Sequence, residues 1–214
     1  MSIDQPSKIK NILWDLDGTL FDTYPAITYA INKTLKDMGL PIAMNVVDGL
    51  VRQSLSHCVQ GLAQRFKIEP EVLRNRFEES YKTISPTNQP PYPGVQVVCE
   101  HICQTGGKNI ILTHRGVASS RILLEEHNLV HLFSAIYSVE QGYPRKPDPA
   151  MVQAAMHDHD LSPKETLMIG DRVMDVQAGR AAGTCTCLFG QTQQEGIADY
   201  QCQGFDQLLA YLIK

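Results

Sequence analysis

The chain has 214 residues, of which 43% are hydrophobic and 20% are charged, an ordinary composition for a globular protein. Its net charge of −4 and its lack of any lysine- or arginine-rich block argue against nucleic acid or an anionic membrane as a partner. The sequence contains no apolar segment long enough to span a bilayer, and residues 1–10 do not resemble a signal peptide. We therefore expect a cytoplasmic protein with one large domain, or one domain carrying a smaller insertion.

A buried strand is predicted over residues 9–15, and a polar turn follows it at once. The apolar run Ile12-Leu13-Trp14 leads directly into Asp15-Leu16-Asp17-Gly18-Thr19. Alternate residues of a strand point to the same side, so Asp15 and Asp17 should leave the strand end as a converging pair of anions. Such a pair is costly unless a positive group lies beside it, and a divalent cation is the obvious candidate. The alternative is a surface turn with solvated acidic residues.

The next segment has helical periodicity and no convincing strand. We predict four helices here, over residues 22–38, 45–57, 58–66 and 70–82. A proline-rich stretch from Pro86 to Gly94 then indicates a boundary. A structureless connection of this length is improbable, so the segment is best interpreted as a small inserted all-helical domain.

Beyond this boundary, predicted helices and strands alternate. The helices are expected over residues 95–104, 118–127, 149–159, 173–182 and 205–213. The strands are expected over residues 109–113, 135–139, 166–170 and 184–189. Such alternation predicts an α/β fold, with a Rossmann-like, mostly parallel sheet covered by helices on both faces. We assign residues 1–21 and 92–214 to this core domain and residues 22–91 to the helical insertion.

Further polar side chains follow the other predicted strands. Thr113 and His114 come after one strand, Asp171 and Asp175 come after another, and Lys146 lies between the strands predicted over residues 135–139 and 166–170. Each of these residues also has an ordinary structural explanation. Thr113 could be a helix N-cap, Lys146 could be a solvated charge in a loop, and the two acids could lie in a first helical turn, where the helix dipole favours them. Ligands of open parallel sheets bind outside the carboxyl ends of the strands. Four acids, one lysine and one hydroxyl there predict a site for a cation and a phosphate-like anion.

In this order, the motifs resemble those of the haloacid dehalogenase-like hydrolase superfamily. The matching residues are Asp15-Leu16-Asp17-Gly18-Thr19, then Thr113, then Lys146, then Asp171 with Asp175. More narrowly, the chain resembles the phosphoglycolate phosphatase and β-phosphoglucomutase subgroup, which carries a helical cap between the first two motifs. The resemblance covers essentially the whole chain and implies that residues 22–91 are the cap.

The resemblance implies catalytic roles that the residue types suit. Asp15 would be the nucleophile that attacks phosphorus to form an aspartyl-phosphate. Asp17 would protonate the leaving oxygen and later deprotonate the hydrolytic water, kept protonated until needed by the nearby negative charge. Thr113 and Lys146 would neutralise phosphoryl oxygens, and the backbone around His114 would add N–H donors.

The same resemblance implies a Mg²⁺ cofactor. Its expected ligands are a carboxylate oxygen of Asp15, the backbone carbonyl of Asp17, and Asp171. Asp175 would bind the ion directly or through water, and the sequence leaves this choice open. In the cap, Arg52 is a candidate contact for a second anionic group of the substrate, although a solvated helix face is the favoured explanation of this residue.

We therefore expect a Mg²⁺-dependent phosphatase for a small phosphorylated metabolite, similar to phosphoglycolate or a sugar phosphate. The acid at Asp17 favours phosphoryl transfer over carbon–halogen chemistry. One alternative is a sugar-phosphate mutase, and another is a non-catalytic binding protein with the same fold. The protein is expected to be a monomer or a weak homodimer.

Two residues depart from the family pattern. His114 stands where relatives often have asparagine. It would either place an ionisable group at the site or simply keep the backbone contact that the asparagine makes. Trp14 stands where phenylalanine is common, and we expect it to pack in the core with its indole N–H on a backbone partner.

Overall fold

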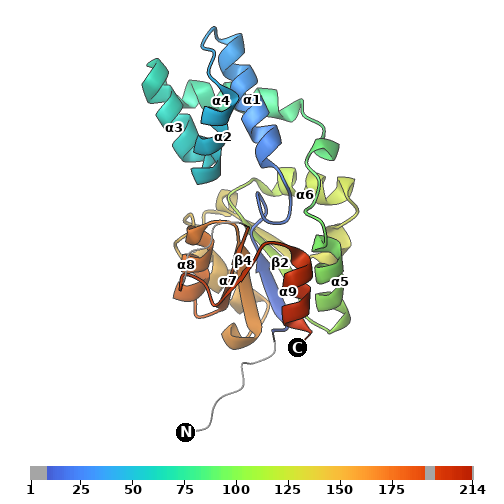
Figure 1. Cartoon of the computed structure of the whole chain (residues 1–214). Helices are drawn as coiled ribbons and strands as arrows, with labels where there is room; N and C mark the ends of the chain where they lie inside the picture. Colours follow the sequence, from blue (N-terminus) through green and yellow to red (C-terminus); the bar gives the residue numbers. More distant parts are fainter. Residues whose placement is uncertain (1–8, 191–195, 214) are drawn as a thin grey trace. The chain divides into compact units, whose positions relative to one another are not determined.

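The structure, a computed structural model, describes residues 9–190 and 196–213. The chain divides into two compact units (Figure 1). The first combines the residues up to Phe21 with those from Pro91 onward, and the second is Asp22–Pro90. Across the described ranges, no helix combines the length and the apolar character that crossing a membrane requires.

A parallel sheet forms the centre of the first unit. In the described residues it has six strands in the order β3-β2-β1-β4-β5-β6, which confirms the predicted α/β fold. The strands are β1 Asn11–Trp14, β2 Asn109–Thr113, β3 Ala135–Ser138, β4 Thr166–Gly170, β5 Cys185–Phe189 and β6 Tyr200–Cys202. β6 was not predicted, because three residues are too few to show an alternating pattern. The strand order reverses between β1 and β4, where open parallel sheets bind their ligands.

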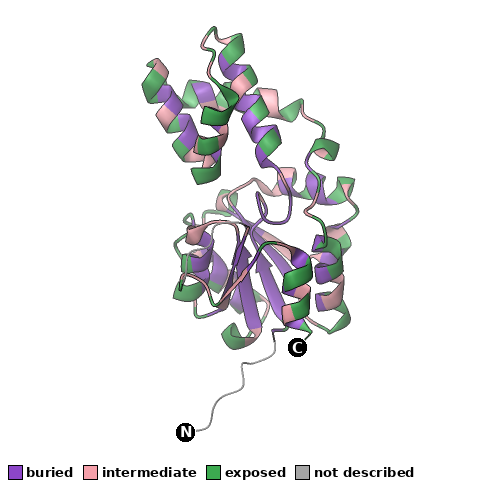
Figure 2. Cartoon of the chain, in the orientation of Figure 1, coloured by how far each residue is buried: buried purple, intermediate pink, exposed green. Residues whose placement is uncertain are grey.

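Helices cover the sheet on both of its faces. They are α5 Val95–Gln104, α6 Val117–Glu126, α7 Ala150–Asp158, α8 Val173–Ala181 and α9 Phe205–Leu212, with short 3₁₀ helices at Val130–Leu132 (η2), Val139–Gln141 (η3) and Pro163–Glu165 (η4). Ile12 and Trp14 of β1 belong to the hydrophobic cluster that contains residues of α5, α6 and α9. Leu13, between them, belongs to the cluster of α7 and α8. The central strands β1, β2 and β4 are therefore buried along their whole length, and Figure 2 shows the middle of the sheet as buried.

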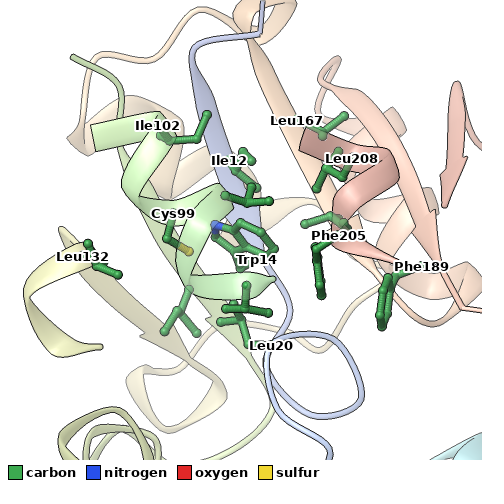
Figure 3. Packing of buried hydrophobic residues seen from close by; sticks show 14 of the residues in the cluster. Ile12, Trp14, Leu20, Cys99, Ile102, Leu132, Leu167, Phe189, Phe205 and Leu208 are labelled. Carbon is green, nitrogen blue, oxygen red and sulfur yellow. The ribbon is translucent and has the colours of Figure 1, made fainter. Parts of the chain in front are cut away.

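Trp14 lies at the centre of one of these clusters (Figure 3). Its ring is 5.6 Å from that of Phe205, and its side chain is fully buried. The indole N–H donates to the side-chain oxygen of Asn109 at 3.0 Å, so the expected backbone partner is wrong. The amide of Asn109 in turn donates to the carbonyls of Cys99 and Leu132. This side-chain bridge keeps buried polar atoms hydrogen-bonded in an apolar core.

The second unit is all-helical throughout. It consists of α1 Tyr24–Asp37, α2 Met44–Gln53, α3 Leu55–Phe66, α4 Pro70–Lys82 and the 3₁₀ helix η1 Pro86–Asn88. Its own core includes Ile31, Leu62 and Phe77. The predicted boundary between two helices after His57 is wrong, because α2 ends at Gln53 and α3 begins at Leu55, with Ser54 between them. The hydroxyl of Ser54 accepts the N–H of His57 at 3.0 Å and so caps α3.

Candidate active site

The loop after β1 starts as a continuation of the strand and then turns sharply. Asp15 donates its N–H to the carbonyl of Ile169 on β4 at 2.9 Å, and its side chain is only 1% exposed. Gly18 has a φ of +82°, a conformation that side chains with a Cβ rarely adopt. Its N–H reaches back to the carbonyl of Phe21 at 2.9 Å. The turn therefore holds Asp15 deep at the carboxyl edge of the sheet.

Lys146 lies between two buried carboxylates. Its ammonium nitrogen is 2.6 Å from Oδ1 of Asp15 and 2.6 Å from Oδ1 of Asp175, and it donates to the carbonyl of Leu112 at 2.9 Å. Burial disfavours the charged lysine, but the two carboxylates outweigh this effect and raise the pKa of Lys146. The interpretation of Lys146 as a solvated loop charge is therefore wrong.

The two carboxylates beside Lys146 differ in their electrostatics. Burial, followed by the negative charge of Asp175, raises the pKa of Asp15 to about 6, against the opposing effect of Lys146 and Arg172. Burial also acts on Asp175, but there the positive charges of Lys146 and Arg172 win and lower its pKa. Without a metal ion, the negative charge is therefore less favourable on Asp15 than on Asp175.

The loop after β4 brings two more acids to this edge. Gly170 allows a close approach, because a Cβ added there would lie 2.3 Å from the Cβ of Asp175. Asp175 is at the third position of α8, and its Oδ2 accepts the N–H of Arg172 at 3.1 Å. Asp175 therefore lies in the first turn of α8, as the sequence suggested, and also contacts Lys146. Asp171 accepts the hydroxyl of Thr19 at 3.5 Å.

Three carboxylates converge in a way that suits a hard cation. Asp15, Asp171 and Asp175 each offer one oxygen, and these oxygens lie within 4.8 Å of one another. Oδ2 of Asp15 is buried and has no hydrogen-bond partner among the described residues, and Arg172 Nη2 lies 3.6 Å from it. An all-oxygen donor set with an orphaned buried oxygen fits Mg²⁺. The side chain of Asp17 lies outside this group, and the role of its carbonyl stays a prediction.

The turn after β2 carries Thr113 and His114, and the latter contacts the loop that holds Lys146. The buried hydroxyl of Thr113 accepts the N–H of Arg115 at 3.0 Å, and Gly116 is the N-cap of α6, so the N-cap interpretation of Thr113 is wrong. Nε2 of His114 accepts the backbone N–H of Lys146 at 2.9 Å. Burial and then the charge of Lys146 lower the pKa of His114 to about 3, so its imidazole is neutral at physiological pH.

Two arginines at this edge carried no role in the sequence interpretation. Arg115 forms an ion pair with Asp17 at 2.6 Å, and Arg172 faces Asp15 and Asp171 at 3.6 and 3.7 Å. Each follows a motif residue by one or two positions, which is the one signal that the sequence offers for them. Asp17 is thus in contact with a cation, and its role as the proton donor stays a prediction.

Arg52 belongs to the helical unit. It forms an ion pair with Asp48 at 2.8 Å, and its guanidinium lies 5.0 Å from the centre of the Tyr24 ring. Its side chain is 54% exposed. These contacts match the interpretation of a solvated helix face, and a substrate contact for Arg52 stays a prediction.

Comparisons with known proteins agree with this arrangement. A family model described as haloacid dehalogenase-like hydrolase matches residues 12–189. A phosphoglycolate phosphatase of Aliivibrio fischeri is 30% identical over 219 residues, covering 96% of this chain and 95% of that protein. A second, from Vibrio cholerae, is 28% identical and covers 89% of each chain.

Solved structures give the same result. The crystal structure of a predicted phosphoglycolate phosphatase from Haemophilus somnus superposes with a TM-score of 0.82 at 25% identity, covering 96% of this chain and 98% of that one. A Thermotoga maritima protein assigned as a β-phosphoglucomutase has a TM-score of 0.79 at 19% identity, covering 96% and 99%. The second likeness concerns the fold alone.

Proposed function

We propose, from the premise that this chain belongs to the haloacid dehalogenase-like hydrolase family, that it is a Mg²⁺-dependent phosphatase. Its substrate would be a small phosphorylated metabolite, similar to phosphoglycolate or a sugar phosphate. The phosphoglycolate phosphatases at 30% and 28% identity support this substrate class. The observation that carries the proposal is Asp15, which is buried at the switch point of the sheet with Lys146 on its Oδ1 and with carboxylate oxygens of Asp171 and Asp175 close by.

Asp15 would attack phosphorus and form an aspartyl-phosphate, while the phosphorus–oxygen bond to the leaving alcohol breaks. Its Oδ1 is held by Lys146, and its Oδ2 has no hydrogen bond within the described part of the chain. Lys146 would stabilise the negative charge that shifts among the phosphoryl oxygens in the transition state. The contact between His114 and the N–H of Lys146 fixes the loop that carries this lysine.

Asp17 would act twice in this scheme. It would give a proton to the leaving oxygen in the first step, and take one from the water that attacks the aspartyl-phosphate in the second. Water attack then breaks the bond between phosphorus and the Asp15 oxygen, releases inorganic phosphate and restores the carboxylate. Thr113, at the end of the neighbouring strand, would donate its hydroxyl to a phosphoryl oxygen.

The cation would be held by carboxylate oxygens of Asp15 and Asp171 and by the carbonyl of Asp17, with Asp175 binding it directly or through water. When bound, Mg²⁺ supplies positive charge that neutralises phosphoryl oxygens and favours the ionised form of the nucleophile. A sugar-phosphate mutase would use the same aspartyl-phosphate, and no specific contact among the residues that the structure describes favours it over hydrolysis. A non-catalytic role is disfavoured because Asp15, Asp17 and Lys146 are all present.

A phosphoester panel tests the proposal. Phosphate release from 2-phosphoglycolate, hexose phosphates and pyrophosphate is measured with Mg²⁺ and with EDTA. We expect Mg²⁺-dependent release that falls by about three orders of magnitude or more in Asp15→Asn. Asp37→Asn, which removes the same charge from an exposed side chain, should retain full activity.

Wild-type protein that releases phosphate from no ester would refute the phosphatase. An Asp15→Asn variant with full activity would refute the nucleophile. Conversion of glucose 1-phosphate to its 6-phosphate, activated by a bisphosphate and without phosphate accumulating, would establish the mutase instead.

A further inference from the structure

One ion pair that this reaction scheme leaves unused joins Arg115 to Asp17. Nη2 of Arg115 lies 2.6 Å from Oδ1 of Asp17, and Nε lies 3.1 Å from Oδ1 and 3.3 Å from Oδ2. The guanidinium is 8% exposed and the carboxylate 22%. The two residues are 98 positions apart, at the ends of neighbouring strands β2 and β1. Such a shielded contact through two donor nitrogens is stronger and more directional than an exposed ion pair.

The structure also holds Arg115 in place from its other side. Its Nη1 donates to the hydroxyl of Ser119 on α6 at 2.9 Å. Its backbone N–H donates to Thr113, and its carbonyl accepts the hydroxyl of Ser138 at the end of β3 at 2.8 Å. Contacts other than the one to Asp17 therefore fix the position of the Arg115 backbone and guanidinium. An anchored planar donor fixes both the position and the rotation of the carboxylate that it binds.

We propose that Arg115 is a positioning residue for Asp17. It holds the carboxyl group where the proton must pass to the leaving oxygen and, later, from the attacking water. This inference rests on the proposed phosphatase function. It separates Arg115 from Lys146 and Thr113, which would act on the phosphoryl group itself.

A positioning role and a bracing role in the fold predict different kinetics. An alkyl phosphate needs a proton on its leaving oxygen, whereas 4-nitrophenyl phosphate leaves as a stable phenolate and needs none. Misplacing Asp17 therefore slows the first step for the alkyl ester alone, and slows the second step for both. If Arg115 only stabilises the local fold, its removal would slow the first step for both esters alike.

The experiment compares Arg115→Met with Arg121→Met, which changes an exposed arginine on α6, the helix that follows Arg115. Steady-state rates are measured with 2-phosphoglycolate or the best alkyl ester of the panel, and stopped-flow traces with 4-nitrophenyl phosphate. For Arg115→Met we expect kcat for the alkyl ester to fall about 100-fold with KM little changed. The nitrophenolate burst should keep its rate within a few-fold and be followed by a slow steady state.

Arg115→Lys keeps the charge but loses the planar fork, and should give a smaller loss of the same kind. It also tests the inference if thermal unfolding shows that Arg115→Met does not fold. Equal losses in both first steps, or a wild-type alkyl rate in Arg115→Met, would overturn the positioning role alone. Wild-type protein with no activity on any ester would overturn the proposed function, and this inference with it.

Discussion

Replacing the nucleophile should make the metal-free protein more stable. Burial and the charge of Asp175 raise the pKa of Asp15 from 3.8 to about 6 in the folded state. Such a shift corresponds to a penalty of about 3 kcal/mol on the folded state when the carboxylate is ionised. Asparagine has nearly the same shape and cannot ionise. We therefore expect Asp15→Asn to raise the free energy of unfolding at pH 7.5 by about 2–3 kcal/mol.

The gain should depend on pH in a defined direction. Between pH 3.8 and about 6 the folded state binds more protons at Asp15 than the unfolded state does, so the stability of the wild type falls as pH rises through this window. The penalty is complete above pH 6. At pH 4.5 the folded carboxyl is mostly protonated, and the advantage of Asp15→Asn should shrink to about 1 kcal/mol.

Urea unfolding in EDTA, followed by tryptophan fluorescence, measures this difference. Trp14 is the single tryptophan of the chain and is buried next to Asp15, so it reports on the α/β unit. At pH 7.5 the gain corresponds to about 5–10 °C in Tm for a chain of this size. Asp37→Asn, on the exposed end of α1, controls for net charge. An Asp15→Asn variant that is no more stable at pH 7.5, or equally stabilised at both pH values, would refute the reasoning.

Two further predictions concern the groups around the nucleophile. The pKa of His114 is lowered to about 3, so the unfolded state binds more protons there and the wild type loses stability as pH falls from 6.5 toward 3. The stability of His114→Asn relative to the wild type should therefore increase by about 2 kcal/mol between pH 7 and pH 5. A difference in urea unfolding that does not change with pH would contradict this. Mg²⁺ at about 100 times its Kd should stabilise the wild type by about 2.7 kcal/mol in thermal unfolding, and Asp171→Asn should abolish most of this rise. An Asp171→Asn variant with the full Mg²⁺ shift would remove Asp171 from the proposed ligand set.

The sequence by itself was sufficient to predict most of the fold. Apolar runs and helical periodicity predicted five of the six strands in the described residues, and the nine α-helices there, apart from shifted ends and the break at Ser54. It also predicted that Asp15, Lys146 and Asp171 gather at one edge, because the carboxyl ends of parallel strands share that edge. These features are encoded locally, in the period of the side chains and in the position of each motif along its strand.

Only the tertiary structure decided which side chains meet at that edge. Lys146 bridges Asp15 and Asp175, His114 accepts the N–H of Lys146, and Arg115 binds Asp17 instead of solvent. A strand pattern tells which face a side chain occupies, but the register of its neighbours and the rotamers of long side chains determine its partner across the sheet. Asp17 therefore looked in the sequence like an acid facing another acid, and in the folded protein it is held by an arginine 98 residues away.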